Sequence, residues 1–361
     1  YLAKKSWWET FEPYQMYNHI PGYLEWNRKD RFNKHMMEYK ILSGKQIWAI
    51  PTTFRLNSST ERKKFRKVLF EEGGISRPWV LKVPNLDRGK GVTMLGPNTE
   101  ALKTVLDKVE NDEEHKYIIQ EYVCNAMTIE GYKFDFRIYW LVASVDPLIV
   151  LWHPCFIRII KSQKYDELMK NWNSTTAHLG NMHWSGTAAS WGTFAENLEA
   201  RKNSSKSLGK RINALTDSAL HHVENQVKHS LAEMVDAFKD VTFTNNGTSS
   251  EHKFGFYGAD YLIDRDLDVY FIEPQNACGM MSEKDQFFDD LGQSWKNVNA
   301  QLTEGMAEIL NIVTKQQELG LPISNEALEY AAGSEYEVIY NDGWMFEYEG
   351  YERPTKKGCE I

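Results

Sequence analysis

The strict alternation of residue types between Tyr132 and Trp140 constrains the fold more than any other feature of the chain. Aromatic and aliphatic residues alternate there with Lys133, Asp135 and Arg137. Because side chains in a β-strand point alternately to opposite faces, this segment predicts a strand with one apolar face and three neighbouring charges on the other. One interpretation is a solvated sheet face, whose surface ion pairs contribute little stability. The other is a polar face that binds a ligand.

Length and composition predict a globular chain with two or three domains. The 361 residues include 42% hydrophobic residues, which is enough for a substantial core. No apolar run approaches the roughly 20 residues that span a bilayer, and the first residues lack the hydrophobic segment of a signal peptide. We therefore expect a cytoplasmic protein without a membrane partner.

The cysteines are too scattered to predict a zinc site or a disulfide framework. They lie at Cys124, Cys155, Cys278 and Cys359, without a Cys-x-x-Cys pair. This pattern favours a reducing, intracellular compartment.

The net charge of −8 hides an asymmetry along the chain. Basic residues outnumber acidic ones in residues 1–70, and the reverse holds in residues 318–361. The basic end is suited to attract an acidic partner, although both ends are equally consistent with ordinary solvated surface. We expect no nucleic-acid partner.

Strands interspersed with helices predict an α/β or α+β fold built around sheets. Apolar segments predict strands at 45–51, 79–83, 92–95 and 117–123. A helix is expected at 99–111. Residues 183–213 are rich in Ser, Gly, Asn and Lys and are expected to form a mobile loop. An amphipathic helix is expected at 216–238, with Thr216 as its N-cap. Its three histidines are not spaced for metal and are expected on the surface: His221, His222 and His229.

A lysine inside an apolar strand is followed by a glycine-rich turn with two cations. Lys82 precedes the run Arg88-Gly89-Lys90-Gly91. Glycines let backbone N–H groups approach phosphate oxygens, and the cations supply compensating charge. Glycines serve turns more often than phosphates, however, and the spacing is neither a P-loop nor a Rossmann fingerprint.

Residues 256–273 read as a β-hairpin that carries two acids. With the turn at residues 265–266, Asp260 and Glu273 become diagonal neighbours on one face. Two carboxylates beside the amides of Gln275 or Asn276 are suited to bind Mg²⁺. The alternative is a pair of surface acids on an edge hairpin, which the apolar neighbours disfavour.

These motifs, in this order, resemble the tubulin tyrosine ligase-like family, whose catalytic core is an ATP-grasp fold. The resemblance covers most of residues 15–280. The matching segments are Asn18-His-Ile-Pro-Gly22, Lys29-Asp30, Ile50–Phe54, Lys82, Arg88–Gly91, Gln120-Glu-Tyr122, Gly131–Arg137, Arg158, His178-Leu-Gly-Asn181, Asp260 and Glu273. The implied organisation is a smaller N-terminal domain (1–60), a central domain (61–125), a C-terminal ATP-grasp domain (126–317) and an acidic aromatic tail (318–361).

The resemblance implies a ligase that uses ATP to activate a carboxylate as an acyl phosphate, which the amine of an amino acid then attacks. The implied cofactors are ATP and Mg²⁺. The implied partners are a free amino acid (tyrosine, glutamate or glycine) and an acidic protein tail, most simply that of tubulin. The implied location is the cytoplasm, at the cytoskeleton or a cilium.

The resemblance also implies roles for individual residues. Catalytic cations would clamp the transferring oxygens and a substrate carboxylate: Lys133, Arg137 and Arg158. Nucleotide-binding residues would be Lys82, Arg88, Gly89, Lys90, Gly91, Gln120, Tyr122, Asp135, His178 and Asn181. Asp135 would bind a ribose hydroxyl or an amine. Metal ligands would be Asp260 and Glu273, with Gln275 or Asn276 as the amide ligand.

The chain departs from the family's pattern at two positions. Gln275 stands where the family usually has asparagine, and Gly180 stands where it commonly has threonine. A first interpretation is a ligase on tubulin, with the basic residues 61–67 steering the acidic tail. A second is a catalytically silent, nucleotide-binding scaffold or regulator. A third is an ATP-grasp ligase for small molecules or other peptides. The aromatic tail is expected to pack on the core or to dock onto a partner.

Overall fold

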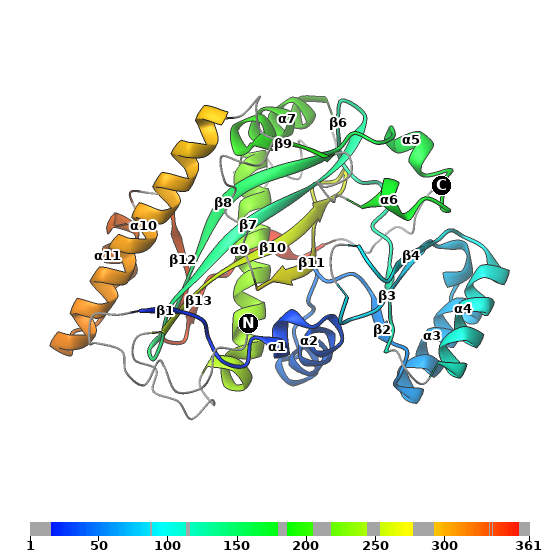
Figure 1. The fold of residues 1–361 in the computed structure, drawn as a ribbon, viewed down its shortest axis with the longest axis horizontal. Coiled ribbons are helices and arrows are strands. Elements are labelled where there is room, and N and C mark those ends of the chain that lie inside the picture. The colour runs from blue at the N-terminus through cyan, green and yellow to red at the C-terminus, as the bar shows by residue number, and fades with distance from the viewer. Residues whose placement is uncertain are drawn as a thin grey trace.

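Two β-sheets organise the chain, as Figure 1 shows. The computed structural model describes residues 16–86, 89–112, 116–179, 186–204, 218–243, 253–276, 292–331, 333 and 335–353. The larger sheet has nine strands in the order β1-β10-β7-β8-β12-β13, with β11 beside β10, β6 beside β7 and β9 beside β8. The smaller sheet has four strands in the order β2-β5-β3-β4. The mixed fold built around sheets is thus confirmed.

The larger sheet consists of β1 (Tyr17–Asn18), β6 (Thr128–Ile129), β7 (Tyr132–Val145), β8 (Leu148–Ile160), β9 (Gly186–Ser190), β10 (Lys253–Ile263), β11 (Val269–Gln275), β12 (Glu337–Asn341) and β13 (Trp344–Met345). The smaller sheet consists of β2 (Thr53–Arg55), β3 (Trp79–Lys82), β4 (Val92–Leu95) and β5 (Ile118–Glu121). The helices are α1 (Leu24–Asn27), α2 (Lys29–Ser43), α3 (Ser59–Glu71), α4 (Thr99–Asn111), α5 (Tyr165–Leu168), α6 (Thr175–His178), α7 (Trp191–Ser204), α9 (Ala219–Phe238), α10 (Gly292–Leu319) and α11 (Asn325–Ala331). Short helical turns are η2 (Gly74–Ser76), η3 (Lys239–Phe243) and η5 (Glu349–Tyr351).

The central strand β7 determines where a polar site can lie. Its predicted apolar face, from Phe134 to Trp140, is buried in a core shared with α9. Its opposite face carries the predicted charges as far as Arg137 and then buries Tyr139 and Leu141 in a second core with α10. Helix α10 therefore covers one end of this face, and the charged end stays available to the rest of the chain.

The smaller sheet has its own core, closed by α3 and α4 on the side away from the larger sheet (Figure 1). Helix α3 begins at the N-cap Ser58, whose hydroxyl accepts from the Glu61 amide (3.4 Å), while the Glu61 carboxylate accepts from the Arg55 amide (2.6 Å). The basic residues 61–67 belong to this outer helix. Their steering of an acidic tail stays a prediction.

The strands expected at 79–83, 92–95 and 117–123 are confirmed as β3, β4 and β5. Helix α4 spans the expected residues 99–111. The prediction of a strand at 45–51 is wrong, because these residues form no strand. A backbone hydrogen bond links them to the larger sheet: the Ala49 carbonyl accepts from the Phe271 amide at 2.8 Å. Residues 186–204, which were expected within a mobile loop, form β9 and α7 instead. The strand β9 pairs with β8, which explains the ordered backbone there.

The start and the environment of α9 correct two expectations. Its N-cap is Ser218, whose hydroxyl accepts from the His221 amide at 3.1 Å, and not Thr216, which lies outside the described residues. The histidines His222 and His229 are buried rather than on the surface. The C-terminal segment covers this side of the helix, which a pattern local to the helix does not reveal.

We expect Ser218→Ala to lower the free energy of unfolding by about 1 kcal/mol, because the substitution removes the N-cap acceptor of a long core helix. Urea denaturation measures the effect. Ser218→Asp is the matched control, since it restores an acceptor and should match the parent. Equal stability of Ser218→Ala and the parent would contradict the cap assignment.

The acidic aromatic segment after residue 317 packs back on the core. Strand β12 pairs antiparallel with β8 at the edge of the larger sheet. Tyr336 and Val338 are buried with α10, and Tyr351 is buried near α9. Of the two expected outcomes, packing on the core is confirmed for the described part of this segment.

One cysteine differs from expectation: Cys124 is disulfide-bonded. A single bond is no framework, but the scattered cysteines no longer support the inference of a reducing compartment. Among the described helices, none combines the length and apolar character needed to cross a membrane.

Candidate functional site

Four neighbouring strands of the larger sheet bring together five predicted site residues, here called the charged row: Asp135, Arg137, Arg158, Asp260 and Glu273. Arg158 on β8 lies opposite Asp135 on β7, and Arg137 on β7 lies opposite Asp260 on β10. Asp260 in turn lies opposite Glu273 on β11. Residues that are directly opposite in antiparallel strands share a face, and so do Asp135 and Arg137, which lie two residues apart on β7. Each arginine therefore has an acid on the neighbouring strand, and the second acid, Glu273, follows Asp260.

The hairpin of β10 and β11 differs from the expected one. Its strands separate at Ile263 and Val269, and the register shifts between Asp260 and the next residue. An irregularity of this kind inserts one extra residue into a strand and changes which residues face one another. As a result Glu273 lies directly opposite Asp260 rather than diagonally. The expected turn at 265–266 was therefore too short, and the acids lie closer than the sequence indicated.

Asp260 is buried between two arginines. Its carboxylate accepts from Arg137 Nε at 2.7 Å and from Arg137 Nη2 at 2.8 Å, and Arg158 Nη2 lies 3.0 Å away. Burial alone would raise the pKa of Asp260, but the two guanidinium groups outweigh it and lower the pKa to about 2. Asp260 is therefore ionised and fixes the orientation of both arginines.

Asp135 also binds Arg158, with its carboxylate 2.5 Å from Nε. Burial and the neighbouring charge of Asp260 nevertheless raise the pKa of Asp135. The two acids thus share Arg158 but differ in their tendency to ionise.

Glu273 is held from two sides. Its carboxylate lies 3.0 Å from Lys29 Nζ and accepts from Gln275 Nε2 at 2.8 Å. The Gln275 amide is also 3.5 Å from Asp260, so it bridges the two acids. Burial raises the pKa of Glu273, but Lys29 outweighs this effect and the net pKa is lowered. Lys29 belongs to a motif that matches the family, but its contact with Glu273 was not predicted from the sequence.

The smaller sheet contributes Lys82 and Gln120. Lys82 Nζ donates to Gln120 Oε1 at 2.7 Å, and both side chains are buried. Burial is the main cause that lowers the pKa of Lys82 to about 8, and the charges of Glu273, Lys29 and Lys133 also act on it. Lys82 lies on β3 of the smaller sheet, whereas Glu273 and Lys133 lie on β11 and β7 of the larger sheet.

The predicted phosphate loop joins β3 to β4. Gly89 and Gly91 have φ of 77° and 68°, which favours glycine, and a Cβ on either would lie within 3 Å of a neighbouring side chain. Lys90 between them is exposed. The Gly91 carbonyl accepts from the Val83 amide at 2.9 Å, which closes the loop. Arg88 lies outside the described residues.

Tyr122 joins the two sheets through a cluster of rings. Its hydroxyl accepts from Lys133 Nζ at 2.9 Å and is 3.0 Å from His178 Nδ1. Burial, followed by the charge of Lys133, lowers the pKa of His178 to about 4, so the imidazole is neutral at pH 7. Trp172 stacks on His178 with ring centroids 4.9 Å apart, and no motif in the sequence indicates this contact. Asn181 and Gly180 lie outside the described residues.

The residues around Asp260 and Glu273 suit Mg²⁺. In the described part of the chain, no three His, Cys, Asp or Glu side chains are placed so that they could hold a metal ion by themselves. Mg²⁺ in nucleotide sites usually takes only one or two carboxylates and completes its shell with water and phosphate oxygens. Gln275 is the amide within reach, whereas Asn276 is exposed at the end of β11. Two opposed carboxylates with a neighbouring amide therefore fit the ion.

Comparison with known proteins places this geometry in a family. A sequence model of the tubulin-tyrosine ligase family matches residues 9–277. Tubulin polyglutamylase TTLL5 of Mus musculus is 28% identical over 287 residues, which is 74% of this chain and 20% of that protein. Probable tubulin polyglutamylase TTLL2 of Mus musculus is 24% identical over 278 residues, 75% of this chain and 47% of that protein. Tubulin polyglutamylase TTLL7 of Mus musculus is 27% identical over 289 residues, 73% and 29% respectively. The chain thus covers at most about half the length of these relatives.

A solved structure with a similar fold is the C-terminal domain of Pby1 from K. lactis, an ATP-grasp enzyme that interacts with the mRNA decapping enzyme Dcp2. The TM-score is 0.53 with 16% identity, over 85% of this chain and 77% of that one. The likeness shows an ATP-grasp fold, which confirms the fold class that the motifs implied. Because the family match spans residues 9–277, which include the smaller sheet and every residue of the charged row, the chain belongs to the tubulin-tyrosine ligase family.

Proposed function

We propose that the chain is an ATP-dependent ligase that joins glutamate to a carboxylate of an acidic tubulin tail. The observation that carries this proposal is the excess of cations around the row of acids. Five cations gather there against three carboxylates: Lys29, Lys82, Lys133, Arg137 and Arg158 against Asp135, Asp260 and Glu273. A net positive, largely buried site is suited to a triphosphate and to anionic substrates.

On nucleotide binding, some of these cations would contact phosphate oxygens of ATP in place of their present protein partners. Lys82 and the Gly89–Gly91 loop would hold phosphate oxygens, and Lys29 is close enough to the loop to donate to the Leu86 carbonyl at 3.3 Å. Asp260, Glu273 and Gln275 would hold Mg²⁺, which when bound neutralises phosphate charge and polarises the transferred phosphoryl group. Arg137 and Arg158 would then remain oriented by Asp260 toward the reacting oxygens.

The reaction has two steps in this scheme. An acceptor carboxylate oxygen attacks the γ-phosphorus, the bond to the β-phosphate oxygen breaks, and ADP leaves. The amine of the incoming amino acid then attacks the acyl carbon, loses a proton, and displaces inorganic phosphate to leave an amide. The arginines would stabilise negative charge in both steps, and one of them would bind the carboxylate of the incoming amino acid.

The choice of glutamate and tubulin draws on the three relatives, which are named tubulin polyglutamylases. The test is tubulin-dependent release of ADP and phosphate with glutamate, tyrosine or glycine present. Release that requires both tubulin and glutamate supports the proposal. Release with glutamate and a small carboxylate acceptor, but not with tubulin, would favour the third interpretation given by the sequence. A cytoskeletal site of action follows from the same proposal.

One observation favours a second candidate, a nucleotide-binding member without turnover. Gln275 bridges both acids through its amide nitrogen, and its side chain is one carbon longer than the family's asparagine. Mg²⁺ tolerates such geometric change poorly. This candidate predicts stabilisation by nucleotide without release of ADP under any combination of substrates.

The pKa of Lys82 predicts a pH-dependent nucleotide affinity. Its pKa is lowered to about 8, so the ammonium that would bind phosphate is lost as the pH rises through that value. We expect the dissociation constant for ATP, measured by calorimetry, to rise about tenfold between pH 7 and pH 9. Lys82→Met should bind weakly at both values and lose the dependence. A parent affinity that stays constant over this range would contradict the phosphate role.

A further inference from the structure

The C-terminal segment Tyr348–Arg353, here called the strap, reaches the hairpin that carries the two acids. It lies beyond residue 277, where the family match ends. Its backbone and side chains run along α9: the Tyr348 amide donates to His229 Nδ1 at 2.8 Å, and the Tyr348 hydroxyl is 2.8 Å from His222 Nδ1. Tyr351 stacks on His229 with centroids 4.0 Å apart and donates to Glu233 at 2.5 Å. The strap is thus fixed to a core helix.

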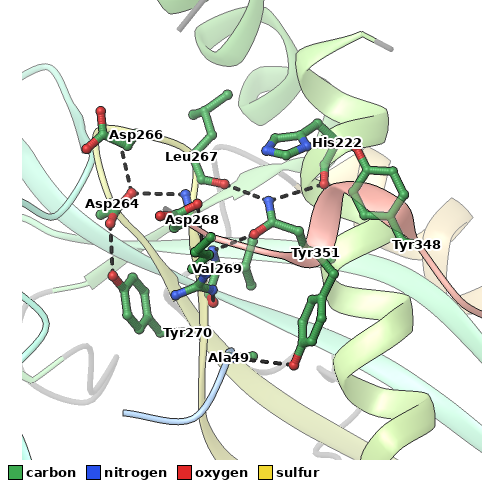
Figure 2. Close-up of polar contacts among 12 residues, drawn as sticks. Ala49, His222, Asp264, Asp266, Leu267, Asp268, Val269, Tyr270, Tyr348 and Tyr351 are labelled. Carbon is green, nitrogen blue, oxygen red and sulfur yellow. Dashed lines mark hydrogen bonds and ion pairs between the residues drawn. The ribbon is translucent and has the colours of Figure 1, made fainter. Parts of the chain in front are cut away.

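The turn between β10 and β11 is held tightly within itself, as Figure 2 shows. Asp264 accepts from the amides of Asp266 (3.0 Å) and Asp268 (2.9 Å) and from the Tyr270 hydroxyl (3.0 Å). Leu267 has φ of 62°, an uncommon conformation for a branched side chain. These contacts shape the turn, but they do not set its position relative to the rest of the molecule.

Two side chains from outside the hairpin hold Val269, the first residue of β11. From α9, Gln226 Oε1 accepts from the Val269 amide at 3.2 Å, and its Nε2 donates to the Leu267 carbonyl at 2.7 Å. From the strap, Arg353 Nη2 donates to the Val269 carbonyl, and Nε lies 3.8 Å from the Asp268 carboxylate. The Arg353 side chain is fully buried, so its guanidinium group is shielded from solvent.

A second link joins the strap to β11 through one residue. The Ala49 amide donates to the Tyr351 hydroxyl at 3.3 Å, visible in Figure 2, and the Ala49 carbonyl accepts from the Phe271 amide at 2.8 Å. The strap therefore contacts β11 directly at Val269 and, through Ala49, at Phe271, and both positions precede the irregular part of the strand.

The irregular register makes an anchor at Val269 consequential. Asp260 pairs with Glu273 while Tyr261 pairs with Phe271, so one residue of β11 is extra. A strand that loses this extra residue slips by one position, and a slip of one turns every side chain beyond it to the other face. Glu273 would then leave the face of Asp260.

We propose that the strap is a positioning element for the carboxylate pair and that Arg353 is its positioning residue. Arg353 touches no group of the charged row; it fixes where β11 begins and so keeps Glu273 opposite Asp260. This inference rests on the proposed function, because the carboxylate pair matters as a Mg²⁺ site. It assigns a role in that site to a part of the chain outside the family match.

The test compares Arg353→Met with Tyr348→Phe in the full chain. The second variant removes a strap hydroxyl that contacts α9 and leaves both links to β11 intact. The first readout is the Mg²⁺ concentration that gives half of the thermal stabilisation by ATP. We expect this concentration to rise about tenfold in Arg353→Met and to match the parent in Tyr348→Phe. A parent-like Mg²⁺ requirement in folded Arg353→Met would overturn the proposal.

Arg353→Lys covers the case in which the methionine variant does not fold. Lysine keeps the charge but offers fewer donors in a fixed plane. We expect an intermediate rise of about threefold in the Mg²⁺ requirement, and an unchanged requirement would again overturn the proposal.

Hydrogen exchange supplies a readout that needs no nucleotide. Arg353→Met or Arg353→Lys should speed exchange in Phe271–Gln275 at least tenfold relative to Tyr348→Phe, while exchange in α9 stays equal among the variants. Equal rates in β11 would overturn the role of Arg353. A parent that shows no Mg²⁺-dependent binding of ATP would instead contradict the proposed function, and the exchange result would still decide whether the strap fixes β11.

Discussion

Glu273→Gln is expected to reduce Mg²⁺-dependent turnover at least about a thousandfold while the protein stays folded. The substitution keeps the volume of the side chain and removes the charge that lies opposite Asp260. Losing one carboxylate ligand weakens the metal that would neutralise the phosphates, an effect of several kcal/mol on the barrier. Steady-state release of ADP measures the loss.

Glu110→Gln is the matched control for this variant. Glu110 pairs with Arg66 on the outer helices, away from the charged row, and the same change there should leave turnover unchanged. Circular dichroism establishes that both variants fold. Turnover of Glu273→Gln within a few fold of the parent would contradict the metal role of Glu273.

Asp260→Asn is expected to affect both stability and turnover. The substitution removes the buried counter-charge of Arg137 and one of the two carboxylates that Arg158 contacts, which costs about 3 kcal/mol in the free energy of unfolding. Turnover should fall at least about a thousandfold, because the variant loses a metal ligand and the group that orients both arginines. Urea denaturation and ADP release measure the two effects.

The pH dependence of unfolding separates the ion pair from other causes. Because the pKa of Asp260 in the folded protein is lowered from 3.8 to about 2, its ionised form stabilises the fold. This contribution is complete above pH 3.8 and is lost as the pH falls through about 2. The stability difference between parent and Asp260→Asn should therefore shrink over that range. A difference that is constant with pH would mean that the carboxylate charge is not the cause.

The sequence predicted the members of the charged row partly from local strand patterns and partly from the order of the motifs. The alternation around Lys133, Asp135 and Arg137 indicates both the strand and its polar face, and the structure agrees. Motif order then indicated that Arg158, Asp260 and Glu273 belong to the same site. Neither pattern requires knowledge of contacts between distant parts of the chain.

The remaining features depend on contacts that no local pattern reveals. The irregular register at Asp260 changes a diagonal pair into a direct one, and the strand that carries it is held by Gln226, a residue of the distant helix α9. Lys29 enters the site because α2 lies beside β11 in space. Burial of His222 and His229 depends on the strap, more than 100 residues later in the chain. A histidine on a helix is predicted as exposed unless its cover is known.

The most direct test of the proposed ligase is mass spectrometry of tubulin tails after incubation with the protein, Mg·ATP and isotopically labelled glutamate. The proposal predicts a labelled mass increment of one or more glutamate residues on an acidic tail, absent with Glu273→Gln and present with Glu110→Gln. Unmodified tails with the parent, under conditions where ATP still stabilises the protein against heat, would contradict the ligase and support a nucleotide-binding member without turnover.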